Sequence, residues 1–284
     1  MNEITLSMDE KFSSLKRFIV EKGKDGVVIA FSGGVDSTTL ASICREVLGE
    51  KVVAVIAQSP TYPAVELAEA KKVAKEIGIK IFVIETQEML NKNFSKNPEN
   101  RCYYCKKELL TQLLKLASAM GFKTVFEGTN YSDLAEHRPG YRAVEELPNV
   151  YSPWVNNKFT KDEIRELAKK RKLSVQDKPS LACLASRIPY NQTITAKKLN
   201  RVEKAEQIIK EIIKVSQLRV RDHDGIARIE VGKEERAHFC STEIFDKINN
   251  ELKQLGFKYV TIDLEGYKTG NMLKTLKNQN ESLR

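Results

Sequence analysis

The sequence predicts an α/β protein in which helices cover both faces of a parallel sheet, followed by a smaller α/β domain. Short runs of apolar, β-branched residues alternate with segments of helical apolar spacing, which is typical of such a sheet. A glycine-rich turn directly after the first of these apolar runs also supports this fold class. The expected strands are residues 27–31, 51–57, 80–84 and 124–127, and the expected helices are 12–22, 63–77, a helix ending near 120, and 160–172.

The turn after the first strand predicts a phosphate-binding loop. Its members are Ser32, Gly33, Gly34, Val35, Asp36 and Ser37. Glycines let the backbone approach a ligand closely. We expect a helix to open at Thr38 with hydroxyl caps, and its free N–H groups and positive dipole end favour phosphate. The turn lacks the Gly-Lys-Ser/Thr ending of a Walker loop. A turn that binds nothing is the alternative.

The composition is that of an ordinary soluble protein. The 284 residues are 41% hydrophobic and 30% charged, enough for one large domain or two of ordinary size. No apolar run approaches the roughly 20 residues that span a bilayer, and the first ten residues are unlike a signal peptide. These features predict a cytoplasmic protein with no membrane partner.

The net charge of +9 suits an anionic partner, either nucleic acid or a phosphorylated small molecule. The basic residues are interspersed with 38 acidic ones rather than gathered in a block, so solvated helix faces explain them equally well. Charge alone does not decide between these partners.

A second, smaller domain is expected after residue 194. The alternation there predicts a hairpin between two helices and a last strand after the second helix. These elements are a helix over 195–215, strands over 218–221 and 226–231, a helix over 241–255 and a strand over 258–264. The predicted domains are residues 1–194 and 195–284.

Five cysteines in a chain without a secretory signal argue against a disulfide framework. Cys102 and Cys105 form a Cys-x-x-Cys pair, which we expect on a loop before a helix. Cys183 lies in a stretch bracketed by two prolines. Cys44, among apolar residues, is expected in the core, and Cys240 is expected to be structural.

Spacing alone leaves four explanations open for the pair and Cys183. The three thiols could hold an iron–sulfur cluster, or zinc with His137, His223 or Cys240 as the fourth ligand. The pair could instead be a redox dithiol. All three could also be ordinary thiols.

Several blocks together resemble the LarE family, the ATP-dependent sulfur transferases that help to make the nickel-pincer cofactor of lactate racemase. They are the loop at 32–37, Glu-Gly-Thr-Asn at 127–130, Arg-Pro-Gly at 138–140, the cysteine block at 182–190, and residues 218–221 and 265–270. The loop itself resembles that of the pyrophosphate-loop ATPases, such as NAD and GMP synthetases and tRNA thiolases. The resemblance therefore implies an adenine nucleotide alpha hydrolase-like fold.

The resemblance implies that ATP adenylates a carboxylate of a pyridinium biscarboxylate mononucleotide and that a sulfur nucleophile then displaces AMP, leaving a thiocarboxylate. This order is sensible because a carboxylate oxygen is a poor leaving group until it is activated, whereas sulfur attacks well near neutral pH. Residues 32–37 and Asn130 are expected to bind ATP. Asp36 is expected to hold Mg²⁺ against the leaving pyrophosphate, with helix capping as its alternative role.

The resemblance also marks Cys183 as the sulfur-bearing residue. Single-cysteine members of the family give up the sulfur of the matching cysteine. This chain adds Cys102 and Cys105, and so resembles the branch in which three thiolates hold a [4Fe-4S] cluster whose open iron carries a sulfide. A sulfide or another sulfur donor is then a partner. The family fold implies that Cys183 lies near Cys102.

Arg219 and Arg221 lie two residues apart on an expected strand, so their side chains leave the same face. Two guanidinium groups there could clamp the substrate phosphate, and a solvated hairpin is the alternative. Arg187 is a weaker candidate for the same task.

Glu127, Asn130 and Asp133 follow the end of a strand and could contact nucleotide or metal, or form a plain turn with Asx capping. Trp154 and Tyr151 are expected to be core or interface residues.

Two further functions stay open. An iron–sulfur-dependent tRNA thiolase shares the loop, the adenylation and the three cysteines, but the sequence contains no separate RNA-binding module. A nucleotide sensor or sulfur-carrier adaptor would bind ATP without releasing pyrophosphate. The hexamers formed by relatives of LarE imply a homo-oligomer.

Overall fold

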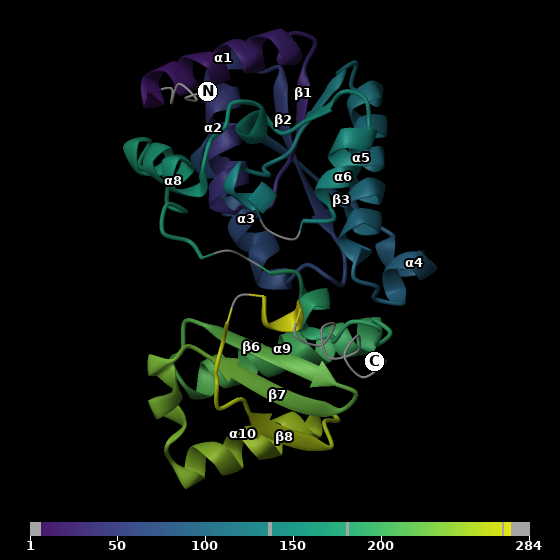
Figure 1. Ribbon diagram of the computed structural model, residues 1–284, viewed down its shortest axis with the longest axis vertical. Coiled ribbons are helices and arrows are strands. Elements are labelled where there is room, and N and C mark those ends of the chain that lie inside the picture. Colours follow the sequence, from purple (N-terminus) through teal and green to yellow (C-terminus); the bar gives the residue numbers. More distant parts are fainter. Residues whose placement is uncertain (1–6, 136–137, 180–181, 269, 274–284) are drawn as a thin grey trace, which may run out of the picture. The chain divides into compact units, whose positions relative to one another are not determined.

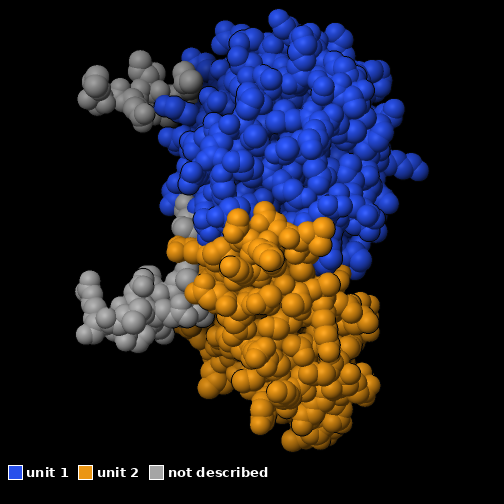
Figure 2. Space-filling model, turned by 90° about the vertical axis from the view of Figure 1, so that its right-hand side faces the viewer, with its two compact units in different colours: residues 1–88, 100–181 blue, residues 89–99, 182–284 orange. Residues whose placement is uncertain are grey.

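A computed structural model describes residues 7–135, 138–179, 182–268 and 270–273. The chain forms two compact units, which have different colours in Figure 2. Unit 1 comprises residues up to 88 and 100–181, and unit 2 comprises 89–99 and residues from 182 onward. The division into domains of residues 1–194 and 195–284 remains a prediction. Within the described ranges, no helix is long and apolar enough to cross a membrane.

Unit 1 is built on the predicted parallel sheet, whose strand order is β3-β2-β1-β4-β5. Val27 of the central strand is in register with Val52 on one side and Thr124 on the other. The strands are β1 (Val27–Ala30), β2 (Val52–Gln58), β3 (Lys80–Glu85), β4 (Thr124–Phe126) and β5 (Val150–Tyr151). The last was not predicted, because two residues carry no periodicity.

Helices cover both faces of this sheet, as predicted (Figure 1). Helices α1, α2, α3 and α8 pack on one face, and α5 and α6 pack on the other. The helices of unit 1 are α1 (Met8–Gly23), α2 (Val35–Leu48), α3 (Ala64–Glu76), α5 (Arg101–Ala119), α6 (Tyr141–Glu146), α7 (Pro153–Asn156) and α8 (Lys161–Lys170).

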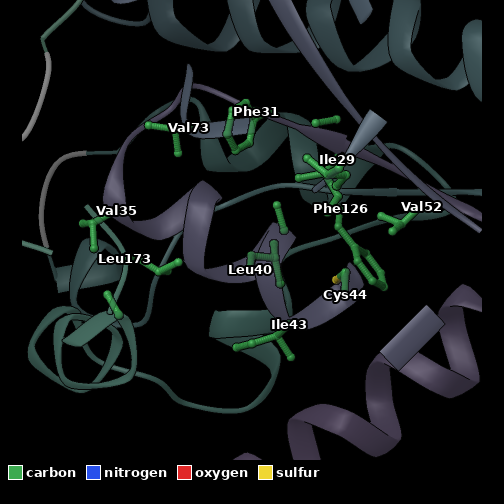
Figure 3. Packing of buried hydrophobic residues seen from close by; sticks show 14 of the residues in the cluster. Ile29, Phe31, Val35, Leu40, Ile43, Cys44, Val52, Val73, Phe126 and Leu173 are labelled. Carbon is green, nitrogen blue, oxygen red and sulfur yellow. The ribbon is translucent and has the colours of Figure 1, made fainter. Parts of the chain in front are cut away.

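The central strand β1 contributes alternate side chains to two hydrophobic clusters. Ile29 packs in the cluster that contains Leu40 and Phe126 (Figure 3), whereas its neighbour Val28 belongs to the cluster that contains Leu110. Because both faces are covered, the strand is apolar throughout. This burial fixes where the chain leaves the sheet and enters the nucleotide loop.

Unit 2 contains a three-stranded sheet of order β6-β7-β8. The predicted hairpin is confirmed, since β6 and β7 pair antiparallel, and β8 pairs parallel to β7. Helix α9 packs on β6 and α10 packs on β8. Its strands are β6 (Leu218–His223), β7 (Ile226–Val231) and β8 (Tyr259–Ile262), and its helices are α4 (Lys92–Ser95), α9 (Ala196–Ile212) and α10 (Thr242–Gln254).

Candidate active site

The nucleotide loop, residues 32–37, begins directly after β1 and leads into α2. Gly33 has a φ of 65°, and a Cβ there would lie 2.7 Å from the Cβ of Ala70 on α3. Only glycine therefore fits without a shift of the backbone. The Ser37 hydroxyl lies 3.1 Å from Ser32 Oγ and accepts a hydrogen bond from the Ser32 N–H at 3.2 Å. These contacts close the loop into a defined turn.

Helix α2 begins three residues before the predicted start, at Val35 rather than Thr38. Its N-cap is Gly34, and no side chain caps it. The prediction of hydroxyl caps near Thr38 is wrong, as is helix capping as a role for Asp36. Thr39 instead donates its hydroxyl to the Val35 carbonyl at 2.7 Å, inside the helix. A helix start without a side-chain cap is well suited to receive an anionic group.

Asp36, in the first turn of α2, is held by three other elements. Its carboxylate forms an ion pair with Lys161, the first residue of α8. Asn130 Nδ2 lies 3.4 Å from Asp36 Oδ1. The buried Trp154 donates its Nε1–H to the Asp36 carbonyl at 3.1 Å. The structure thus brings together two predicted nucleotide-site residues, Asp36 and Asn130, with a lysine that the sequence analysis missed.

Lys161 owes its position to the predicted capping box of α8. Thr160 accepts a hydrogen bond from the Glu163 N–H, and Glu163 accepts one from the Thr160 N–H. A lysine in the first turn of a helix opposes the helix dipole. That unfavourable placement, directly after a strong capping signal, is what could have marked Lys161 as a functional residue.

Glu127 directly follows β4 and is 3% exposed. Lys106 Nζ donates to its Oε2 at 2.7 Å and to Thr129 Oγ1 at 2.9 Å, and Ser152 donates to its Oε1. Burial acts to raise the pKa of Glu127, but Lys106 and the Ser152 and Thr129 hydroxyls outweigh it and lower that pKa below its ordinary 4.5. Glu127 is therefore a buried, paired carboxylate.

The loops after β1 and β4 meet because these strands are neighbours in the sheet. A Cβ on Gly128 would lie 3.2 Å from the Ser37 backbone nitrogen. Helix α2, which follows β1, and helix α6, which follows β4, lie on opposite faces of the sheet. The carboxyl ends of strands at such a point are where open α/β sheets bind ligands. The predicted nucleotide loop therefore lies at the expected edge of the sheet.

Asp133 stabilises the turn after β4. A plain turn with Asx capping was one of the two roles that the sequence left open for this residue. Its N–H donates to Asn130 Oδ1 at 3.1 Å, and the Asn130 N–H donates to Asp133 Oδ2 at 3.2 Å. Arg138 pairs with Asp133 at 2.5 Å. These bonds orient the Asn130 amide toward Asp36.

The Cys-x-x-Cys pair lies in the first turn of α5, so the prediction of a loop before the helix is wrong. The helix begins at Arg101, because a first turn needs no apolar periodicity to form. Residues three apart on a helix are neighbours, so both thiols occupy one side of α5. Cys102 is exposed and Cys105 is half-buried. A Cβ on Gly140 would lie 3.3 Å from the Cys102 carbonyl, which explains the glycine of the Arg-Pro-Gly turn.

Cys183 is an exposed residue of unit 2 that immediately precedes a short 3-10 helix, Leu184–Arg187. Arg187 is 4% exposed and forms two bonds to Glu206 of α9, at 2.8 and 2.9 Å. It also donates to the carbonyls of Ala182 at 2.8 Å and Cys183 at 3.3 Å. Arg187 therefore holds the backbone that carries Cys183, and most of its donors are used within the protein.

Arg221 is likewise buried and paired, so a solvated hairpin does not describe it. Its guanidinium donates to Glu230 at 2.7 Å and to the Ser186 carbonyl at 2.6 Å. Glu230 is fully buried and also binds Arg228 at 2.8 Å and Asn271 at 3.1 Å. Arg221 thereby ties the cysteine segment to β6 and β7.

Arg219 differs from the other two predicted arginines. Within the described part of unit 2, it contacts an aromatic ring, Tyr267, at 5.3 Å and a carbonyl, that of Leu218, at 2.7 Å, rather than a carboxylate. Burial lowers the pKa of Arg219, and so does the nearby Arg187. A half-buried guanidinium beside another cation is best stabilised by an anion. Glu206 acts to raise the pKa of Arg219, but its carboxylate already pairs with Arg187.

The remaining cysteines and histidines lie apart from these features. Cys44 is fully buried in the core, as expected, and burial raises its pKa. Cys240 is exposed, and His223 is part of β6. His137 lies outside the described residues. Across the described ranges, no group of three or more Cys, His, Asp or Glu side chains is arranged to hold a metal ion.

We expect Lys106→Met to lower the free energy of unfolding by about 3 kcal/mol at pH 7, because it leaves the buried Glu127 carboxylate unpaired. The normal pair stabilises the fold above pH 4.5 and loses that effect as pH falls through the lowered pKa of Glu127. In the variant, burial dominates and raises the pKa of Glu127. The difference in the free energy of unfolding between variant and wild type therefore becomes smaller as pH falls.

Denaturant titrations between acidic and neutral pH measure this difference. The double variant Lys106→Met/Glu127→Gln should recover most of the loss. Lys107→Met, which removes an exposed lysine paired with Glu146, should cost less than about 1 kcal/mol. Equal losses for Lys106 and Lys107 would contradict the assignment of a buried ion pair.

Several known proteins are similar to this chain over much of its length. Residues 7–119 match the family model described as NAD synthase. The chain is 39% identical over 269 residues to an uncharacterized protein of Synechocystis, covering 95% of this chain and 99% of that protein. It is 31% identical over 170 residues to the NH(3)-dependent NAD(+) synthetase of Pyrococcus horikoshii, covering 58% and 64%.

The chain is also 32% identical over 251 residues to the pyridinium-3,5-bisthiocarboxylic acid mononucleotide synthase of Lactiplantibacillus plantarum, covering 88% of this chain and 90% of that enzyme. The chain belongs to the LarE family, the family of this synthase within the NAD synthase-like pyrophosphate-loop enzymes.

Proposed function

We propose that this protein is an ATP-dependent sulfur transferase that converts a carboxylate of a pyridinium biscarboxylate mononucleotide into a thiocarboxylate. The observation that carries the proposal is the glycine loop with its Asp36–Lys161 ion pair at the carboxyl end of β1. The chain that contains this loop aligns with 90% of the length of a synthase whose name gives a bisthiocarboxylic acid as its product.

The proposed reaction consists of two displacements. A carboxylate oxygen of the substrate attacks the α-phosphorus of ATP, and the bond to pyrophosphate breaks, which leaves an acyl adenylate. A sulfur nucleophile then attacks the acyl carbon, and the carbon–oxygen bond to AMP breaks. Adenylation is required because the oxygen of a free carboxylate is a poor leaving group. Once that oxygen belongs to AMP, it leaves readily with the electron pair of the carbon–oxygen bond.

In unit 1, the loop and the start of α2 are assigned to the phosphates of ATP. Lys161 would neutralise charge on the leaving pyrophosphate, and Asp36 would hold Mg²⁺ through its carboxylate oxygens. The Asn130 amide, directed at Asp36, keeps that carboxylate in place. The contacts among these three residues support a common role in one nucleotide site.

In unit 2, Arg219 is assigned to the phosphate of the mononucleotide, because its described hydrogen bond and ring contact involve no carboxylate and the nearby Glu206 is already paired with Arg187. Arg187 and Arg221 remain candidates for the same phosphate. Their bonds to Glu206, Glu230 and backbone carbonyls give them a second task, which is to hold the segment that carries Cys183.

For the sulfur, we propose that Cys102, Cys105 and Cys183 together hold a [4Fe-4S] cluster. The first two fit this role, since thiols three residues apart at the start of α5 lie on one side of the helix. When bound, the cluster would supply an iron that carries sulfide. Cys183 would be the third ligand. Sacrificial use of the Cys183 sulfur is the alternative.

The substrate is tested by incubating anaerobically purified protein with ATP, a sulfide source and either the pyridinium biscarboxylate mononucleotide or bulk tRNA. We expect pyrophosphate release and a mass increase of the mononucleotide by replacement of oxygen with sulfur. Thiolated tRNA without a modified mononucleotide would assign the protein to the tRNA thiolases. ATP binding without pyrophosphate release would indicate a nucleotide sensor.

Lys161→Met should lower kcat for pyrophosphate release about 100-fold, because it removes a cation from the charge that develops on the leaving group. Lys170→Met on the same helix, whose lysine pairs with Glu166 on the exposed surface, serves as the matched control. Unchanged pyrophosphate release in Lys161→Met would remove this lysine from the site.

Cys102→Ala tests the sulfur source, with the exposed Cys240→Ala as control. If three cysteines hold the cluster, Cys102→Ala loses multiple turnover together with bound iron and acid-labile sulfide, while Cys240→Ala retains them. If Cys183 alone donates sulfur, Cys102→Ala still gives one product per chain. A colourless but fully active wild-type protein would discard the cluster.

A further inference from the structure

The loop after β2, residues 59–62, contacts the nucleotide loop within unit 1. The Tyr62 hydroxyl donates to the Ser32 carbonyl at 2.8 Å. The strands that precede these two loops, β1 and β2, are hydrogen-bonded neighbours in the sheet. The Tyr62 ring packs against the hydrophobic cluster that contains Phe31. This hydroxyl therefore ties the first residue of the nucleotide loop to the neighbouring strand end.

The turn that carries Tyr62 has a defined shape. The Tyr62 N–H donates to the Ser59 carbonyl at 3.1 Å, and the Thr61 hydroxyl lies 2.8 Å from Ser59 Oγ. Thr61 also donates to the buried Glu88 carboxylate at 3.0 Å. Helix α3 begins two residues later, at Ala64. The Tyr62 hydroxyl is therefore presented from an ordered turn.

The Gly33 N–H is the group that this contact affects. The Ser32 N–H donates to Ser37 Oγ at 3.2 Å, and the Gly34 N–H donates to Ser32 Oγ at 3.3 Å. The Gly33 N–H, by contrast, has no acceptor among the described residues. The peptide between Ser32 and Gly33 is trans, and the carbonyl and N–H of a trans peptide point in opposite directions. Because Tyr62 holds the Ser32 carbonyl, the Gly33 N–H is directed away from Tyr62.

We propose that Tyr62 is a positioning residue for the adenylation step: it fixes the Ser32–Gly33 peptide so that the Gly33 N–H can donate to a phosphate oxygen of ATP. This inference rests on the proposed function, which assigns the loop to those phosphates. A hydrogen bond from a backbone N–H to an ionised phosphate is stronger than one between neutral groups. Without the Tyr62 hydroxyl, the peptide can rotate, and this donor is no longer held toward the phosphate.

A tyrosine hydroxyl suits this task because it stays protonated. Burial raises the pKa of Tyr62, and so do the carboxylates of Glu66 and Glu69. Those carboxylates are in turn paired with Lys178, at 2.8 and 2.7 Å. A neutral phenol donates to the carbonyl and adds no negative charge beside the phosphates, whereas a phenolate would repel both.

The test measures the affinity of the full-length protein for ATP by calorimetry in the presence of Mg²⁺, and for adenosine by ligand-observed NMR. Adenosine lacks the phosphates, so its affinity reports on the remainder of the nucleotide site. The variant is Tyr62→Phe, which keeps the ring and removes only the hydroxyl. Tyr103→Phe is the matched control, because the Tyr103 hydroxyl donates to Glu146 at 2.6 Å on the other face of the sheet.

We expect the Kd for ATP to rise about tenfold in Tyr62→Phe and to stay unchanged in Tyr103→Phe, because a hydrogen bond to a charged group is worth about one order of magnitude in affinity. The Kd for adenosine should not change in either variant. At saturating ATP, kcat for pyrophosphate release by Tyr62→Phe should lie within about twofold of wild type, since the N–H binds the phosphate equally before and after the phosphorus–oxygen bond breaks.

An unchanged Kd for ATP in Tyr62→Phe would overturn the positioning role and leave the proposed function intact. Equal weakening of ATP and adenosine binding would also overturn it, because the hydroxyl would then support the whole nucleotide site rather than one phosphate contact. A wild-type protein that does not bind ATP would reject the proposed function, and this inference with it.

Discussion

The adjacency of β1 and β4 is the constraint on which the nucleotide site depends. Four α-helices and two strands separate them in sequence, yet they are hydrogen-bonded neighbours, so the loops that follow them emerge at one edge of the sheet. The approach is close enough that a side chain on Gly33 would meet α3 and one on Gly128 would meet the start of α2. The sheet thereby places Asp36 beside Asn130.

Paired charges then determine which surrounding elements face this edge. Asp36 holds the start of α8 through Lys161, and Glu127 holds the first turns of α5 through Lys106. Because an unpaired charge at these positions would be costly, each pair orients a helix as well as a side chain. The helix that carries Cys102 and Cys105 is thus anchored to the same strand end that borders the nucleotide loop.

Unit 2 uses buried arginines to give an irregular segment a defined shape. Residues 182–190 contain one short 3-10 helix, Leu184–Arg187, and backbone carbonyls outside regular helices and strands need other donors. Arg187 and Arg221 supply them, and Glu206 and Glu230 compensate their charge. Arg219, on the same sheet face as Arg221, donates instead to the Leu218 carbonyl and lies over the Tyr267 ring.

The sequence by itself determined the parallel sheet, the glycine loop, the capping box at Thr160 and the hairpin of β6 and β7, because these depend on local periodicity and turn chemistry. It misplaced the starts of α2 and α5, where polar first turns resemble loops. Only the tertiary structure decided that Lys161 meets Asp36, that Lys106 meets Glu127 and that Arg221 is buried. These pairs join residues far apart in the chain, and their energy comes from desolvation and packing, which no local pattern encodes.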